Sequence, residues 1–419
     1  MPELLYPAYQ KLYSALCNLE RFDKESNFFD NISSLDGFFS EYRNITFVLQ
    51  AQLKHTGHNA AYERNRDRYL KDHWFVEKRN ETTKEQSFQL VKEIQLTVYL
   101  PHLEVAVLNK EFSVENDKPL ESLLSELKEF FAQINRSEVC FSVSFSFHER
   151  NSDVDLLDKL ISGISSMLQF MDAMERDIME NGILCNQLKE KINGMEFLRV
   201  PRDFLLVNDY VYYPCKGTFD RGSRLAARLS TGCESKRLSL ATLAQPTHLN
   251  YDGTPFNNFT LMHAVLCGMQ PGKDKDLMPV IMVVYGDGTY DMDVFHASLK
   301  TTMYRKINET ARIISSQDVK EVFYMSIYSY SHFPKELSVL ATSKERMAAS
   351  KTDLLVCASI NERLEEKEYV FDGREMDKPG YVAHIMKNGM TNSLRASRLN
   401  LHPIWQAFSD KQKSSVSKQ

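Results

Sequence analysis

The sequence predicts an α+β protein: an N-terminal helical bundle with a small strand-rich insertion, followed by a C-terminal α/β domain. Apolar residues recur at helical spacing through the first 80 positions, and alternating β-branched residues follow from about position 93. Beyond about residue 248, helix-like and strand-like stretches alternate. Because 419 residues are too many for one ordinary hydrophobic core, we expect more than one domain.

The first part of the bundle, residues 1–92, is predicted to begin with two amphipathic helices. Residues 3–22 and 30–54 each repeat apolar side chains at helical spacing. Gly57 interrupts the second helix, and a highly charged helix then runs through about Asn80.

A strand-rich insertion is predicted for residues 93–150. It contains an alternating hairpin at 93–114, a helix at 117–134 and an alternating strand at 138–147. Residues 151–200 return to one long helix with an apolar stripe, which we expect to complete the bundle.

A connecting region, residues 201–247, leads to the C-terminal α/β domain at 248–408. Its strongest signal is a hairpin at 277–295, where two apolar runs flank a Gly-Asp-Gly turn. The remaining polar residues, 409–419, predict a disordered tail. The other elements expected in the domain are helices at 257–268, 299–315 and 335–348 and strands at 320–328, 353–360 and 367–371.

Composition narrows the class of protein. The net charge of −5 argues against a protein that coats nucleic acid, although it leaves room for a local basic groove. The seven scattered cysteines form no CxxC pair, so we expect a reducing cytoplasm and neither a zinc site nor a disulfide framework. No apolar run approaches about 18 residues, so no membrane span is expected, and no cofactor-binding fingerprint occurs.

Two stretches of the N-terminal section form a pattern. They read FSEYRNITFVLQ from Phe39 to Gln50 and FVEKRN from Phe75 to Asn80. Both resemble bacterial HEPN-type helical domains, and the resemblance covers residues 28–85. It implies a helical bundle that pairs with itself or with a protein partner, in a toxin–antitoxin or phage-defence system. In active members an Arg, a polar residue and, a few positions on, a His cut RNA without a metal.

The sequence departs from that motif at the histidine. After Arg79 and Asn80, the position expected for the His is Lys84. Lysine transfers protons poorly at neutral pH unless its pKa is strongly lowered. His73 lies on a different helical stripe from Arg79 and is predicted to pair with Glu77.

A basic stretch in the connecting region is the other candidate site. With Tyr210, Tyr212, Tyr213 and Phe219 nearby, it is predicted either to bind RNA phosphates and stack bases or to be a solvated linker. Its cations are Lys216, Arg221, Arg224, Arg228, Lys236 and Arg237. His55 and His58 share a helical spacing, but no further ligand completes a metal site near them.

Three functions therefore stay open. The favoured hypothesis is a non-catalytic interaction or regulatory protein that forms a homodimer through its bundle or binds a protein partner. The second is a metal-independent ribonuclease that uses Arg79, Asn80 and Lys84. The third is an RNA-binding regulator that uses the basic stretch.

Overall fold

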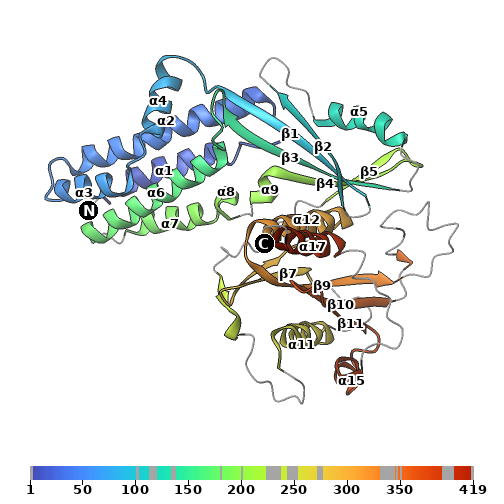
Figure 1. The fold of residues 1–419 in the computed structure, drawn as a ribbon. Helices are drawn as coiled ribbons and strands as arrows, with labels where there is room; N and C mark the ends of the chain where they lie inside the picture. The colour runs from blue at the N-terminus through green and yellow to red at the C-terminus, as the bar shows by residue number, and fades with distance from the viewer. Residues whose placement is uncertain are drawn as a thin grey trace. The chain divides into compact units, whose positions relative to one another are not determined.

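The computed structural model describes residues 3–100, 103–112, 120–133, 138–179, 182–199, 202–222, 237–242, 253–270, 277–330, 345, 348–349, 352–388 and 401–416. Helices combine with antiparallel sheets in an α+β fold, as the sequence predicts (Figure 1). The chain divides into two units. Unit 1 comprises Met1–Gln95, Asn109–Leu127 and Ser144–Val207, and unit 2 comprises Leu96–Leu108, Lys128–Val143 and Asn208–Gln419.

Unit 1 is mainly helical. Its longest helix, α2, begins where the Asn27 side chain accepts a hydrogen bond from the Asp30 amide (2.9 Å), and it packs along α1. The helices of the unit are α1 (Tyr6–Leu19), α2 (Phe28–Leu53), α3 (Asn59–Tyr69), α4 (Trp74–Lys84), α6 (Leu156–Ile178), α7 (Ile183–Asn193), α8 (Glu196–Arg199) and α9 (Arg202–Leu206).

Two predicted helices are each divided in the structure. The charged helix that the sequence predicts through Asn80 is two helices, because the chain leaves α3 after Tyr69 and restarts as α4 at Trp74, whose amide donates to Asp72 Oδ1 (3.0 Å). The long helix predicted within 151–200 ends its first piece at Met179, which has a positive φ of 55°. It restarts after Gly182 as α7.

Phe75 packs α4 against α2 and lies close to α6. Phe75 of α4 is buried, and its ring stacks on Tyr42 of α2 at a centroid distance of 4.6 Å. Gly163 of α6 lies so close to Phe75 that an added Cβ would stand 2.0 Å from the ring. The Tyr42 hydroxyl donates to the Gly163 carbonyl (2.8 Å). The glycine therefore sets how closely α4 and α6 approach.

A five-stranded sheet has the order β2-β1-β3-β4-β5, and the division between the units passes through β1, β2 and β3. The predicted strand-rich segment 93–150 thus shares its sheet with two strands of the predicted connecting region. The elements of this part are β1 (Leu90–Tyr99), β2 (Glu104–Phe112), α5 (Leu120–Ala132), β3 (Val139–Glu149), β4 (Val207–Tyr213) and β5 (Thr218–Arg221).

Unit 2 contains a six-stranded sheet of order β11-β10-β9-β7-β8-β6, in which every neighbouring pair is antiparallel. The C-terminal domain is therefore not a parallel α/β sheet, although its predicted hairpin is confirmed. The elements are β6 (Leu238–Ser239), a 3-10 turn (Leu240–Thr242), α11 (Pro255–Gly268), β7 (Val280–Tyr285), β8 (Thr289–Val294), α12 (Lys300–Ser316), β9 (Val319–Tyr330), β10 (Thr352–Asn361), β11 (Glu366–Asp372), α15 (Tyr381–Asn388) and α17 (His402–Val416).

Helices cover both faces of this sheet (Figure 1). Successive residues of a strand point to opposite faces, so Met282 packs with α11 and α15 while Val283 packs with α12 and α17. The prediction of a disordered tail from Ser409 is wrong for residues 409–416, which belong to α17. Ile404 and Phe408, one helical turn apart, are buried and hold that helix. Most of the predicted helix at 335–348 lies outside the described residues.

Candidate functional site

A cavity of about 500 Å³ lies among the helices of unit 1. Its size falls within the range of roughly 300–1,000 Å³ that is usual for small-molecule sites. The lining comes from α2, α3, the turn between α3 and α4, the start of α4 and the middle of α6. The polar residues of the lining are Tyr42, Arg43, Thr46, Arg66, Asp67, Tyr69, Lys71, Asp72, His73, Ser162 and Ser166.

Arg43 projects into this cavity from the middle of α2. Its Nη1 donates to Thr46 Oγ1 (2.8 Å), one turn along the helix, and its guanidinium lies 4.3 Å from the centroid of the Phe47 ring. No carboxylate within the described ranges pairs with it. Phe47 itself is 44% exposed, so part of this residue stays accessible to a ligand.

Two further arginines lie near Arg43. Burial is the main reason why the pKa of Arg43 is lowered, and the positive charges of Arg79 and Arg66 lower it further while Tyr62 opposes them. An arginine keeps its charge despite such a shift, so the three guanidinium groups concentrate positive charge beside the cavity.

Arg79 is half-buried within α4, one turn after the cavity residue Val76. Its guanidinium lies 6.0 Å from the Phe47 centroid, and Nη1 donates to Asn80 Oδ1 (3.2 Å). Its Nε is buried without an acceptor in the part of the chain that the structure describes. A buried donor without an acceptor is costly, and an anionic ligand supplies acceptors.

The acidic residues of the lining are engaged elsewhere. Asp67 accepts from its neighbour Arg66 (2.8 Å), and Asp72 pairs with Lys159 of α6 (2.8 Å). These two pairs leave the charges of Arg43 and Arg79 uncompensated. The arrangement has the chemistry of an anion site, with guanidinium groups and hydroxyls around an open cavity and an exposed aromatic ring beside it.

The structure separates Lys84 from the other two predicted catalytic residues, Arg79 and Asn80. Arg79 and Asn80 lie inside α4 rather than at its end, and Lys84 is the exposed last residue of that helix. Five residues along a helix turn the chain by about 140° beyond one full turn, so Lys84 projects from a different side of α4 than Arg79. His73 precedes α4 and lines the cavity, and it forms no ion pair with Glu77 among the described residues.

The basic stretch of the connecting region is described in part. Arg224, Arg228 and Lys236 lie outside the described residues. Of the others, Lys216 pairs with Glu345 (2.8 Å), and Arg221 donates to Asn208 (3.2 Å).

Arg237 stacks on the Tyr285 ring at 3.8 Å and donates to Gln317 (2.7 Å). These three described cations therefore each have a protein partner. The prediction that the nearby tyrosines stack bases is wrong, because Tyr210, Tyr212 and Tyr213 are buried in the protein.

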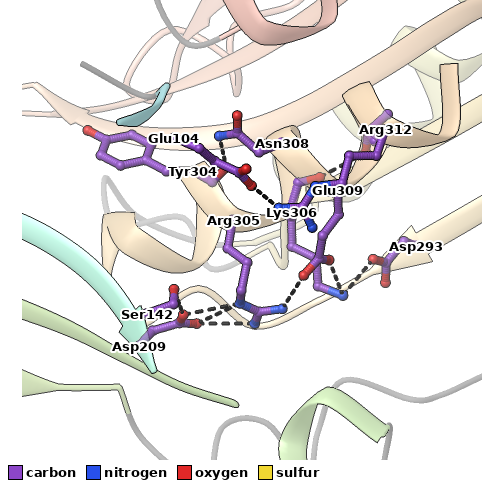
Figure 2. A network of polar contacts seen from close by, with 11 residues as sticks. Glu104, Ser142, Asp209, Asp293, Tyr304, Arg305, Lys306, Asn308, Glu309 and Arg312 are labelled. Carbon is purple, nitrogen blue, oxygen red and sulfur yellow. Dashed lines mark hydrogen bonds and ion pairs between the residues drawn. The ribbon is translucent and has the colours of Figure 1, made fainter. Parts of the chain in front are cut away.

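Unit 2 holds a second polar cluster, and its charges are compensated (Figure 2). The Arg305 guanidinium contacts both carboxylate oxygens of Asp209 (3.1 Å to Oδ1) and also Glu309 (2.9 Å). Lys306 pairs with Asp293 (3.0 Å), and Arg312 pairs with Glu104. Since each cation faces a carboxylate, this cluster joins α12 to β2, β4 and β8 and offers no free charge to a ligand.

The described residues contain no group of three His, Cys, Asp or Glu side chains that could hold a metal ion. Within the same residues, no helix is long and apolar enough to cross a membrane. No protein-family model, curated protein or solved structure matches the chain. The resemblance to HEPN-type domains therefore stays a prediction.

The sequence predicts little of this site. Arg43, Thr46 and Phe47 belong to the stretch that resembles HEPN-type domains, where the residue pattern predicts only a helix. Their spacing of three and four residues was the available signal, because it places all three side chains on one helical face. Nothing in the sequence indicates that Arg66, Ser162 and Ser166 line the same cavity.

Proposed function

We propose that unit 1 binds RNA at this cavity through Arg43, Arg66 and Arg79, as a regulatory module that does not cut it. One observation carries the proposal: Arg43 and Arg79 both approach the exposed Phe47 ring, and neither has a carboxylate partner among the described residues. Guanidinium groups bind phosphates through paired hydrogen bonds, and an exposed ring stacks on a base.

The hydroxyls of the lining favour RNA over DNA. Ser162 and Ser166 of α6 line the cavity together with Arg43. A hydroxyl that donates to or accepts from the ribose 2′-OH is what distinguishes RNA from DNA at a protein site.

Binding without cleavage follows from what surrounds Arg79. Metal-free cleavage of RNA needs a group that moves protons near neutral pH, usually a histidine. Asn80 cannot do this, and Lys84 is exposed on another side of α4.

A ribonuclease is the second candidate, on different residues from those predicted. His73 lines the same cavity as Arg43 and Arg66, so an imidazole and two guanidinium groups surround one space. In that case His73 would be the proton-transfer group, and His73→Ala would abolish cleavage without weakening binding.

The test is fluorescence anisotropy with a short labelled single-stranded RNA, followed by gel analysis of the same metal-free mixtures. We expect Arg43→Ala and Arg79→Ala each to weaken binding about 10- to 100-fold, since a hydrogen bond to a charged group contributes about 1.5–3 kcal/mol. The RNA should stay intact with wild type.

Arg64→Ala is the matched control. Arg64 lies on the same helix as Arg66, but it is exposed, pairs with Asp177 (2.8 Å) and does not line the cavity. Equal losses in Arg43→Ala and Arg64→Ala would contradict the proposed site. If wild type cleaves the RNA and His73→Ala does not, the site is that of a ribonuclease and not of a binding module.

A further inference from the structure

Helix α11 of unit 2 (Pro255–Gly268) carries apolar side chains on its buried face and also on its exposed face. One face packs on the six-stranded sheet through buried residues that include Phe256, Phe259 and Cys267. The other face exposes Met262, Val265, Leu266 and Met269, with exposed fractions of 40%, 50%, 45% and 75%. Large apolar side chains that are exposed side by side mark an interaction surface, so this stripe is expected to have a partner.

We propose that the stripe on α11, residues 262, 265, 266 and 269, binds the same stripe of a second copy of this chain in an antiparallel pair. The first argument is charge. From Thr254 to Gln270 the sequence has no Asp, Glu, Lys or Arg, and His263 is buried with Nδ1 2.8 Å from the Phe259 carbonyl oxygen. Two copies of the helix therefore meet without repulsion between like charges.

The second argument is symmetry. A two-fold interface brings the same surface of both copies together, so each residue must suit the residue that it meets. The stripe is symmetric about the midpoint between Val265 and Leu266. In an antiparallel pair Met262 faces Met269 of the other copy, and Val265 faces Leu266 of the other copy.

The side chains suit such a pairing. Branched aliphatic residues stand at the centre, where packing is tightest, and methionines stand at both ends. Methionine is unbranched and adapts its shape to irregular gaps, which lets the ends of the stripe close against each other.

The size of the stripe sets the expected strength. Its residues span seven positions, or about 10 Å along the helix axis. The exposed apolar area is on the order of a few hundred Å², less than the roughly 800 Å² that each partner buries in an interface of standard size. We therefore expect a weak dimer that dissociates in the micromolar range.

Sedimentation velocity of the full-length chain between about 1 and 100 µM tests the pairing. Wild type should shift from one chain to two across this range. Val265→Glu should stay at the mass of one chain, because burying a charge at the centre of the pair is costly. Met269→Glu should act in the same way, and its position at the helix end, 75% exposed, makes an effect on folding small.

Phe29→Glu is the control, because Phe29 is 72% exposed in the first turn of α2 in unit 1. It should dimerise like wild type, and circular dichroism should show all variants folded. An equimolar mixture of Val265→Glu and Leu266→Lys chains should regain the dimer mass, since position 265 of one copy faces position 266 of the other and the opposite charges then pair. Wild type that stays at the mass of one chain, or variants that dimerise like wild type, would overturn the proposal. A mixture that stays at that mass would overturn the antiparallel pairing.

Discussion

Replacing Gly163 by alanine tests how α4, and with it Arg79, is held against α6. The new Cβ would stand 2.0 Å from the Phe75 ring, far inside van der Waals contact. The ring cannot move aside easily, since Tyr42 stacks on it at 4.6 Å and Trp74 contacts it at 4.9 Å. Overpacking of this kind costs about 1–3 kcal/mol, and the severe overlap favours the upper end. Alanine regains about 1 kcal/mol of helix propensity, so we expect a net loss of about 2 kcal/mol.

The assay is urea unfolding of the full chain, followed by the fluorescence of Trp74. The chain has two tryptophans, Trp74 and Trp405, so a Trp405→Phe background makes the signal report on unit 1. Ser165→Ala, an exposed substitution on the same helix, should change the midpoint little.

A second substitution shows whether the overlap with Phe75 is the cause. Phe75→Leu removes ring atoms that the alanine would strike, so the double variant should lose less stability than the sum of the single variants. If Gly163→Ala raises the urea midpoint instead, the close contact between α4 and α6 is refuted.

Two further predictions concern carboxylates that are buried or partly buried. Asp209→Ala leaves the buried Arg305 without its main partner and should lower the free energy of unfolding, measured in urea, by about 3–5 kcal/mol. Asp293→Ala removes a half-exposed partner of Lys306 and should lower it by less than about 1 kcal/mol. Equal losses would contradict the structural role of the cluster in Figure 2. Burial raises the pKa of Asp36 above its ordinary value of 3.8, although the Phe88 amide donates to it (3.1 Å). The folded state then holds this proton to higher pH than the unfolded state, so the contribution of Asp36 to stability declines as pH rises above about 3.8. Asp36→Asn should weaken that decline and raise the urea midpoint at pH 7; an unchanged pH profile would contradict the assignment.

The sequence predicts the helices and strands of this protein better than it predicts where they break. Apolar periodicity is enough to locate α1 and α2, because each buries one continuous face. The break between α3 and α4 has no Gly or Pro, and its signal is the carboxylate of Asp72 at the start of α4. The Asn181-Gly182 pair in the sequence is a turn signal for the break before α7. The apolar stripe favours one long helix there instead.

Strand direction and charge compensation depend on contacts between distant residues. A strand that follows a helix can pair in either direction, and β9 after α12 pairs antiparallel with β7. Similarly, Arg43 and Arg305 look alike in the sequence. The fold brings Asp209, 96 residues away, to Arg305, and it brings two more arginines to Arg43. Of these two arginines, Arg43 is therefore the one whose charge has no carboxylate partner among the described residues.

The most direct test of the proposed RNA site is the salt dependence of binding. For a single strand the slope of log affinity against log salt is about 0.7 for each phosphate that the protein neutralises. We expect the double variant Arg43→Ala, Arg79→Ala to reduce that slope by about 1.4, while Arg64→Ala leaves it unchanged. A double variant that retains the wild-type slope and affinity would show that these arginines do not bind the RNA phosphates.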